Sequence, residues 1–375
     1  MGKKVVVAGH VCIDLTPMFP RGQKVKNPGD MLIPGKLINM DGIDIHTGGS
    51  VSNTGLAMKK LGADVTLLGK TGTDEIGMMI AKIFGEYDAA EGIMAVEGER
   101  TSYTIAIAVP GVDRIFLHDP GSNDTYSYKE IPEEKLEDVA LLHLGYPPLM
   151  RNMYINEGQE LLEMMQMLKG KGIATSVDMA MVDEASAAGQ EDWKAIITKT
   201  LPYIDFFVPS IEELCWMLDR PRYREWEKRA AGQDMAMILD PEKDIKPLAD
   251  MCMELGAKVL LLKCGAPGLY YKTAGEDKLQ EIAQITGIDA ADWADREGFE
   301  ASYVPEKILS GTGAGDTTIA AFLTSMLEGY SFEMCIHLAA GEGASCVEAY
   351  DSLGGIRSLK ELETKINAGW EKQKF

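Results

Sequence analysis

The run SGTGAGDTTIAAF, residues 310–322, combines residue types that could do chemistry on a phosphate group. Gly311, Gly313 and Gly315 let the backbone approach an anion closely, and the carboxylate of Asp316 follows them. A Walker A loop would need GxxxxGK[ST], with lysine where this chain has aspartate. Beside an anion site, a carboxylate can take the proton from a hydroxyl that attacks phosphorus, while backbone N–H groups stabilise the transferred group. The alternative is that Asp316 only stabilises the start of a helix.

The residues after this loop predict the helix that positions it. Their apolar side chains recur at the spacing of one buried helix face, and a glycine follows as a stop: Ile319, Phe322, Leu323, Met326 and Gly329. Gly313, Ala314 and Gly315 then lie at the helix N-terminus. Unpaired N–H groups and the positive end of the helix dipole attract an anion there.

With these features, the run resembles the second signature of the ribokinase-like (PfkB) carbohydrate kinases. The resemblance implies that Asp316 is the catalytic base and that Gly313, Ala314 and Gly315 form the anion hole. It extends over nearly the whole chain, because other signatures of the family occur in the expected order. It further implies ATP and Mg²⁺ as cofactors, a small sugar or polyol as acceptor, and a homodimer joined through a lid of β-strands.

A second segment resembles the first signature of the same family. It is GGSVSNTGLAMKKLG, where Gly48 and Gly49 permit close approach to a ligand and Asn53 offers both a donor and an acceptor. The resemblance implies that these three residues bind the acceptor. It implies the same for Asp14, after the first strand, since a carboxylate suits a diol, and for Asn123 in HDPGSNDTY. A plain loop leading into a helix, and a solvated aspartate at a strand end, are the alternatives.

On the nucleotide side, LLLKCGAPGLYY resembles the strand and turn that border ATP in the family. The resemblance implies that Lys263, Gly265 and Gly268 lie along the ATP site, together with Gly311 and Gly313. Glu213, in VPSIEEL, matches a glutamate that organises Mg²⁺ through water. Because Ser210 precedes it by three residues, the same pair also predicts a capping box at a helix start.

Two departures from the family pattern bear on specificity. Ser310 stands where ribokinase-type members carry the aspartate of a monovalent-cation site, which argues against potassium activation. In VDMAMVD, Asp178 is kept, but Ala180 and Val182 replace the Asn and Arg of several fructose and sugar-acid kinases. A fructokinase or ketodeoxygluconate kinase is therefore disfavoured, and no residue selects the acceptor.

The elements that must position these residues read as an α/β fold. Short, nearly continuous apolar runs alternate with helical patterns, as expected of parallel strands buried on both faces. The predicted strands lie in KVVVAG, ADVTLLG, ALLHLG, GIATSVD, IDFFVP and AKVLLLKCG. We expect a ribokinase-like, mainly parallel central sheet, covered by helices on both faces, with a small β-sheet lid.

Two segments interrupt this alternation. Residues 16–46 are rich in Pro, Gly and polar residues, and residues 101–118 read as a hairpin that turns at PGVD. We assign both to the lid, and residues 1–15, 47–100 and 119–375 to the α/β kinase core. Residues 274–302 are acidic and are expected to form a surface excursion.

Composition limits the partners. The formal net charge of -21 over 375 residues disfavours nucleic acid or an anionic membrane. The six cysteines form no CxxC pair and look like reduced core thiols, the five histidines show no zinc spacing, and neither a signal peptide nor a membrane span is predicted. We therefore expect a cytoplasmic protein.

Two other functions fit the same features. A nucleoside kinase of the same fold would need lid residues that stack a base, and the lid offers Met18, Phe19, Tyr103 and Phe116. A non-catalytic protein that binds a sugar or nucleotide is the other, although it would have little use for Asp316. A dinucleotide oxidoreductase is disfavoured, because AGHVCID lacks GxGxxG after the first strand.

Overall fold

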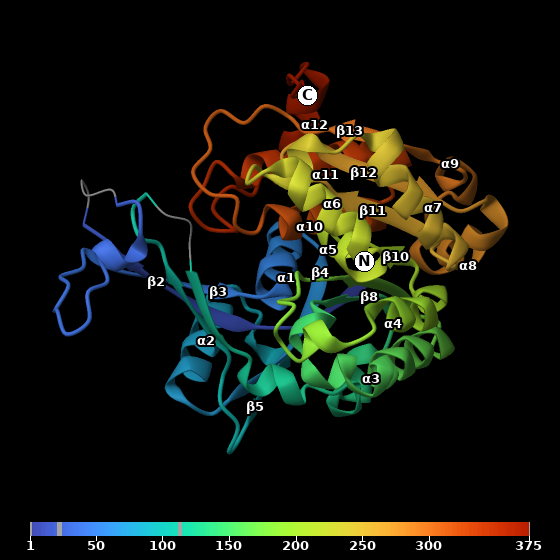
Figure 1. Ribbon diagram of the computed structural model, residues 1–375. Coiled ribbons are helices and arrows are strands. Elements are labelled where there is room, and N and C mark those ends of the chain that lie inside the picture. The colour runs from blue at the N-terminus through green and yellow to red at the C-terminus, as the bar shows by residue number, and fades with distance from the viewer. Residues whose placement is uncertain (1, 21–24, 112–114, 375) are drawn as a thin grey trace.

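The core of the molecule is a nine-stranded sheet, seen in a computed structural model that describes residues 2–20, 25–111 and 115–374. The strand order is β13-β12-β11-β10-β9-β8-β1-β4-β5 (Figure 1). All neighbours are parallel except β12, which is antiparallel to β11 and β13. The strands are β1 (Lys4–Gly9), β4 (Asp64–Gly72), β5 (Ile93–Val96), β8 (Val139–Gly145), β9 (Ala174–Asp178), β10 (Phe206–Phe207), β11 (Val259–Lys263), β12 (Gly268–Thr273) and β13 (Glu297–Ala301). The six predicted strands are all present.

Helices cover both faces of this sheet, as expected. Val6 and Ala8 of β1 pack into the apolar layer under helices α3 to α7, whereas Val5 and Val7 pack into the layer under α1, α2 and α8 to α12. Because side chains alternate along a strand, a continuous apolar run can fill two layers at once. The mainly parallel sheet with helices on both faces is therefore confirmed.

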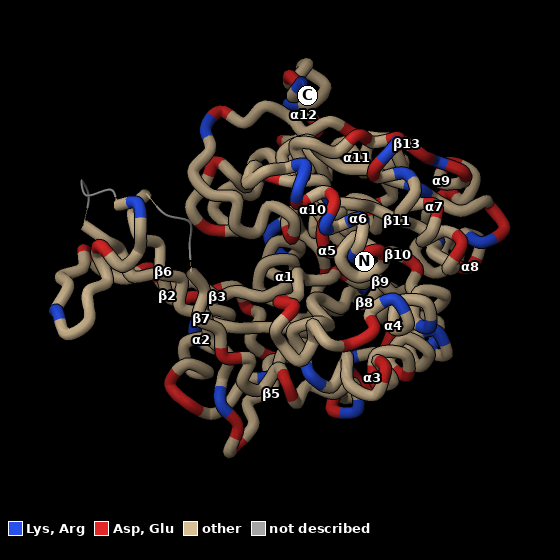
Figure 2. Tube along the Cα trace, in the orientation of Figure 1, with Lys and Arg blue, Asp and Glu red and all other residues tan. Residues whose placement is uncertain are grey.

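The helices are α1 (Ser50–Lys60), α2 (Glu75–Gly85), α3 (Arg151–Gly170), α4 (Trp193–Thr200), α5 (Ile211–Leu218), α6 (Arg220–Ala230), α7 (Lys246–Glu254), α8 (Glu276–Thr286), α9 (Ala290–Trp293), α10 (Ala314–Leu327), α11 (Phe332–Cys346) and α12 (Leu359–Asn367). Among the described residues, no helix is both long enough and apolar enough to cross a membrane. Basic residues lie scattered among more numerous acidic ones along the described trace (Figure 2).

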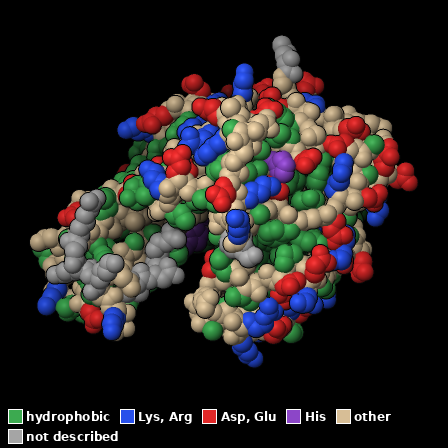
Figure 3. All heavy atoms as spheres, turned by 90° about the horizontal axis from the view of Figure 1, so that it is seen from above, with side chains coloured by type: hydrophobic (Ala, Val, Ile, Leu, Met, Phe, Trp, Pro, Cys, Tyr) green, Lys and Arg blue, Asp and Glu red, His purple; other side chains and the backbone are tan. Residues whose placement is uncertain are grey.

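A separate four-stranded sheet forms the lid and projects from one side of the core (Figures 1 and 3). Its order is β3-β2-β6-β7, with strands β2 (Cys12–Met18), β3 (Gly42–Gly48), β6 (Tyr103–Ile107) and β7 (Ile115–Asp119). β6 and β7 pair antiparallel, so the predicted hairpin is present. Part of its PGVD turn lies outside the described residues. β2 and β3 reach beyond the predicted lid segment, because pairing extends from Met18–Gly42 to Cys12–Gly48.

Two sequence predictions about the core are corrected here. Residues 274–302 are no loose excursion: they form α8, α9 and the edge strand β13, and Trp293 is buried. In the sequence, the acidic residues of this segment obscure the spacing of the apolar residues that become buried. Helix α10 is buried along most of its length rather than amphipathic, because it packs against α1 and α11, and its Phe322 lies against Phe206 of β10. Its predicted buried residues are nevertheless buried, and Gly329 ends it at a φ of 83°.

Candidate functional site

Asp316 lies in the first turn of α10, directly after the glycine-rich loop. Gly313 precedes the helix with a φ of 76°, which L-residues adopt only at a cost, and a Cβ there would lie 2.2 Å from Ser352 Cβ. A glycine is therefore required at this position. As predicted, Gly313, Ala314 and Gly315 lie at the helix N-terminus, where the first backbone N–H groups of a helix have no partner in a preceding helical turn. The Ala314 N–H makes a long hydrogen bond of 3.3 Å to the Gly311 carbonyl oxygen. The Asp316 side chain is buried beside them.

Three side chains donate hydrogen bonds to the Asp316 carboxylate. Asn53 Nδ2 lies 3.2 Å from Oδ2, and Thr54 Oγ1 lies 3.1 Å from Oδ1. Both residues belong to α1. The third donor is the hydroxyl of Tyr146, which follows β8 and lies 2.6 Å from Oδ1. Burial and the negative charge of Asp316 raise the pKa of Tyr146 well above its ordinary value, so its hydroxyl keeps its proton.

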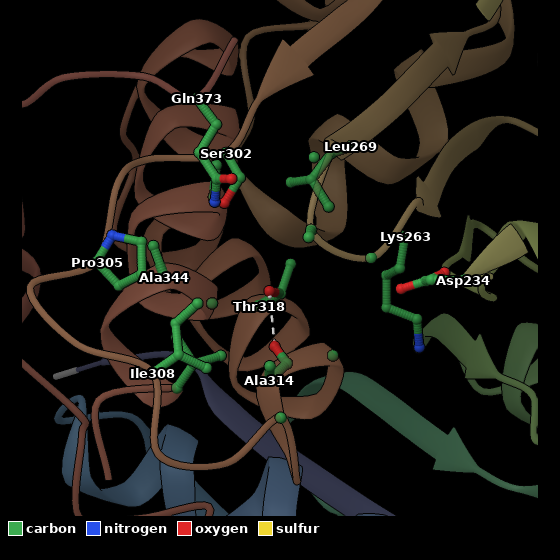
Figure 4. A pocket seen from close by; sticks show the side chains of 18 residues that line it. Asp234, Lys263, Leu269, Ser302, Pro305, Ile308, Ala314, Thr318, Ala344 and Gln373 are labelled. Atoms are coloured by element: carbon green, nitrogen blue, oxygen red, sulfur yellow. Dashed lines mark hydrogen bonds between the residues drawn. The ribbon is translucent and has the colours of Figure 1, made fainter. Parts of the chain in front are cut away.

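Two cavities meet at the loop before Asp316. One, of about 360 Å³, is lined by Leu269, Ile308 and Ala344, and by residues of the glycine-rich loop (Figure 4). The other, of about 460 Å³, contains Asp316 itself together with Tyr146. Five residues line both cavities: Lys263, Gly265, Gly311, Ala314 and Gly315. A ligand in the first cavity can therefore reach into the second past the start of α10.

The predicted nucleotide-side residues come together at this boundary. Lys263 ends β11, Gly265 and Gly268 shape the turn into β12, and all three line the first cavity with Gly311. Both turn glycines have positive φ, and a Cβ on Gly268 would lie 2.0 Å from the Glu300 carbonyl oxygen. Gly313 packs against Ser352 and is not among the residues that line this cavity.

Lys263 forms an ion pair with Asp178 at 2.6 Å, at the carboxyl ends of β11 and β9. Burial alone lowers the pKa of Lys263, but the charges of Asp178, Glu213 and Asp316 outweigh it and raise the pKa. Burial raises the pKa of Asp178 to about 8, against the opposing effect of Lys263. The raised pKa of Lys263 depends on an ionised Asp178, whereas a pKa of about 8 would leave Asp178 protonated at pH 7. The short contact and the carboxylates around the ammonium favour the ionised pair.

Glu213 lies in the second cavity and caps α5. Its Oε2 accepts a hydrogen bond of 2.8 Å from Ser210 N, while Ser210 Oγ accepts one of 3.3 Å from Glu213 N. The predicted capping box is therefore present. Because the carboxylate also lines the cavity beside Asp178 and Asp316, capping does not exclude a second role.

On the lid side, Asp14 lies on β2, opposite the end of β3. Its carboxylate packs against Gly48, where a Cβ would lie 2.3 Å from Asp14 Oδ2. Gly49 has a φ of 84°, and its own Cβ would lie 2.4 Å from the His10 carbonyl oxygen. Close contact with backbone therefore requires a glycine at position 49, whereas a Cβ at position 48 would displace the Asp14 carboxylate. Burial raises the pKa of Asp14 above its ordinary value, and the hydrogen bonds from Cys12 and Thr104 oppose this shift without cancelling it.

The two predicted asparagines have different surroundings. Asn53 donates to Asp316 and accepts a hydrogen bond of 2.9 Å from Ser352 Oγ, so it joins α1 to the start of α10 and to the segment after α11. Asn123 is completely buried, and its amide pairs with the backbone N–H and carbonyl of Val11 at 3.1 and 2.9 Å. In this arrangement Asn123 holds the turn between β1 and β2. Direct contact of Asn123 with an acceptor stays a prediction.

His10 lies beside Tyr146 and was not predicted from the sequence. It follows β1, its ring centroid lies 6.2 Å from that of Tyr146 and 5.5 Å from that of His118, and it is buried. Neither ring nitrogen has a hydrogen-bond partner among the described residues. Burial, helped by His118, lowers the pKa of His10 to about 3, so the ring is neutral at pH 7. A neutral ring offers one donor and one acceptor to a ligand.

Tyr146 and Thr54 were also missed as partners of Asp316. One signal was available for His10 and Tyr146, since both directly follow predicted parallel strands, and ligands bind at the carboxyl ends of such strands. Thr54 lies one residue after Asn53 but gave no such signal. Two residues that depart from the family pattern are also placed by the structure. Ser310 Oγ accepts a hydrogen bond from Thr312 N, and Ala180 lines the second cavity.

With this geometry established, comparisons with known proteins give a consistent result. The family model described as pfkB family carbohydrate kinase matches residues 3–354. An uncharacterized sugar kinase of Archaeoglobus fulgidus is 24% identical over 302 residues, which cover 80% of this chain and 98% of that protein. Ribokinase of Arabidopsis thaliana is 23% identical over 321 residues, covering 84% of this chain and 70% of the relative.

Solved structures confirm the fold. The structure of Arabidopsis thaliana ribokinase complexed with ribose and ATP superposes with a TM-score of 0.68 at 19% identity, covering 97% of this chain and 98% of that one. A putative ribokinase II from E. coli in complex with ATP and Mg²⁺ gives a TM-score of 0.69 at 17% identity, covering 98% and 99%. The ribokinase-like fold expected from the sequence is therefore present.

Proposed function

This chain belongs to the pfkB family of carbohydrate kinases, and from that premise we propose that it transfers the γ-phosphoryl group of ATP to a hydroxyl of a small sugar or polyol. Asp316 acts as general base, and the backbone N–H groups of Gly313, Ala314 and Gly315 form the anion hole. The observation that carries the proposal is the position of Asp316 in the second cavity, at a helix N-terminus and directly after Ala314 and Gly315, which line both cavities.

The reaction follows from this arrangement. ATP occupies the first cavity, with its γ-phosphate at the start of α10, and the acceptor hydroxyl lies against Asp316. The carboxylate takes the hydroxyl proton while the hydroxyl oxygen bonds to the γ-phosphorus. The bond from that phosphorus to the bridging oxygen breaks, and ADP leaves. Charge on the transferred group is stabilised by the N–H groups of the helix start and by the Lys263 ammonium.

The residues present also fit a magnesium ion. Mg²⁺ usually keeps several waters and is held by one or two carboxylates together with substrate phosphates. Asp178, Glu213 and Asp316 line the second cavity, but among the described residues no group of three or more His, Cys, Asp or Glu side chains could hold a metal ion, so substrate phosphates and water would have to complete the site. Bound there, the ion would neutralise phosphate charge. Glu213 would hold it through water.

For the acceptor we propose Asp14, Gly48, Gly49 and Asn53 as the binding residues, and we add His10. A carboxylate and a neutral imidazole together can accept and donate hydrogen bonds to neighbouring hydroxyls. Because the lid carries Asp14 and the core carries His10 and Asn53, an acceptor bound between them would be enclosed, and water would be excluded from the phosphoryl group.

The test is ADP release from Mg-ATP with a panel of acceptors: ribose, fructose, 2-keto-3-deoxygluconate, inositols, adenosine, cytidine and hexose monophosphates. We expect one sugar or polyol to stimulate release. Asp316→Asn should lower kcat by roughly 10²- to 10⁴-fold, the usual contribution of a general base. Its affinity for ATP and its melting temperature should stay near those of the wild type.

Three outcomes would contradict parts of this proposal. Turnover of a nucleoside alone would replace the acceptor class and keep the role of Asp316. Turnover that Asp316→Asn retains would remove Asp316 as the base. ATP binding without turnover of any acceptor would favour a non-catalytic binding protein.

A further inference from the structure

The C-terminal tail after α12, residues 368–374, folds back against the nucleotide side of the core. It lies outside residues 3–354, which match the family model, so the family resemblance says nothing about it. Gly369 turns the chain with a φ of 87°. The tail then runs antiparallel to residues 302–304 and pairs with them, with a bridge between Tyr303 and Lys372.

Several contacts fix the tail in this position. The Trp370 and Tyr303 rings stack with centroids 4.7 Å apart, and Trp370 Nε1 donates to the Val304 carbonyl at 2.8 Å. Val304 N donates to Glu371 O at 2.8 Å, and Lys372 Nζ lies 2.6 Å from Glu300 Oε1. The tail is therefore anchored by stacking, backbone pairing and charge together.

Gln373 extends from this anchored tail into the first cavity. Its backbone N–H donates to Ser302 O at 2.8 Å, and both residues line the cavity. Figure 4 shows Gln373 and Ser302 together at one side of the cavity, with Ala314 and Thr318, at the start of α10, on another. The phosphate end of a nucleotide belongs at the α10 start, so the side with Gln373 is left for the base.

The walls between these two sides suit a planar base. Apolar side chains line the cavity from strand β12, the loop after β13 and the C-terminal end of helix α11: Leu269, Pro305, Ile308, Ala344 and Val347. Such walls give affinity for any purine but do not distinguish one purine from another. Discrimination needs a polar group at the edge of the base, and Gln373 is positioned to supply it.

The hydrogen bond of Gln373 determines which end of its amide is available. Its Nε2 donates to the Tyr303 carbonyl at 3.3 Å. A carbonyl can only accept, so the nitrogen must face Tyr303 and the oxygen must face the other way. Among the described residues no donor bonds to Gln373 Oε1. The group offered to a ligand is thus an acceptor.

We propose that Gln373 selects the nucleotide base: its Oε1 accepts a hydrogen bond from the exocyclic amino group of a 6-aminopurine. A 6-oxopurine would place a carbonyl against the same oxygen, so two acceptors would face each other and the hydrogen bond would be lost. This inference rests on the proposed function for the location of the phosphates. It adds a specificity residue from outside the family match.

The test is a binding titration with the full chain, so that it does not depend on the acceptor. Wild type, Gln373→Met and Lys374→Ala are titrated with Mg-ATP and with Mg-ITP, whose base carries oxygen in place of the amino group. Methionine keeps the length of the side chain without its amide. Lys374 is an exposed residue of the same tail, away from the cavity, and serves as the control.

We expect wild type and Lys374→Ala to bind ATP about tenfold more tightly than ITP, the effect of roughly one hydrogen bond. In Gln373→Met this ratio should fall close to one, through weaker binding of ATP. An unchanged ratio in Gln373→Met, or no preference in the wild type, would overturn the inference and leave the proposed function standing. Failure of the wild type to bind either nucleotide would overturn both.

Discussion

At the scale of single residues, the Asp316 carboxylate depends on donors from two separate elements. Asn53 and Thr54 come from α1, and Tyr146 comes from the turn after β8. Tyr146 adopts the left-handed region, with a φ of 65°, which is uncommon for a residue other than glycine. Local strain of this kind is maintained only when the surroundings require it. We therefore propose that Tyr146 positions Asp316, the proposed general base.

Tyr146→Phe should lower kcat by about tenfold, because the carboxylate loses one of the hydrogen bonds that orient it. The KM for the acceptor should change little if Tyr146 acts through Asp316 alone. Steady-state kinetics with the acceptor that the panel identifies would measure both. Tyr126→Phe is the matched control, since the Tyr126 hydroxyl is buried without a partner among the described residues. A rise in KM with unchanged kcat would instead make Tyr146 a substrate contact.

A second prediction at this scale concerns Glu342, a buried carboxyl in α11. Burial raises its pKa from 4.5 to about 8. The folded state thus holds a proton between these pH values that the unfolded state releases, so stability falls as pH rises through this window. Glu342→Gln should raise the melting temperature at pH 8.5 and change it little at pH 4.5. Thermal unfolding at the two pH values would measure this.

Glu348 is the matched control for that experiment, since it should respond in the opposite sense. Burial alone raises its pKa, but the Glu306 N–H and the Arg357 guanidinium outweigh burial and lower it. Its charge therefore stabilises the fold above the ordinary pKa, and this contribution is lost as pH falls. Glu348→Gln should lower the melting temperature at pH 8.5. Equal effects of both substitutions at both pH values would contradict the assignment.

At the scale of elements, the start of α10 depends on one glycine more than on its neighbours. Gly313 has positive φ and lies against Ser352, whereas Gly311 has open space around a Cβ. Gly313→Ala should destabilise the protein by roughly 1–3 kcal/mol or more, since strain and a steric clash add. Gly311→Ala should have a much smaller effect on unfolding. Comparable loss of stability in both variants would mean that the loop tolerates alanine equally at either position.

The elements themselves show what sequence patterns can predict. The buried strands were found because their apolar runs are continuous, and the β6–β7 hairpin because its apolar residues alternate. The strand β5 was missed because it has only four residues, and the segment from α8 to β13 because charged residues dominate the pattern of its exposed positions. Contacts such as that of Tyr146 with Asp316 join positions 170 residues apart, which no local pattern can reveal.

At the scale of the whole molecule, the lid is a small sheet with two open edges, β3 and β7. Its strands leave apolar side chains exposed, among them Ile43 at 52% and Leu117 at 50%. Open edges and exposed apolar residues favour pairing with another chain. The homodimer through the lid that the family resemblance implies would cover both.

Size-exclusion chromatography with light scattering would test this dimer. The wild type should have about twice the monomer mass of 40.9 kDa, and Leu117→Glu should shift it towards the monomer, because a charge would be buried in the interface. Met237→Glu is the control, since Met237 is similarly exposed, at 47%, but belongs to the core. A wild-type monomer would leave the lid edges open to solvent. A dimer that persists in Leu117→Glu would have its interface on another surface, and closure of the lid over the acceptor would then be independent of assembly.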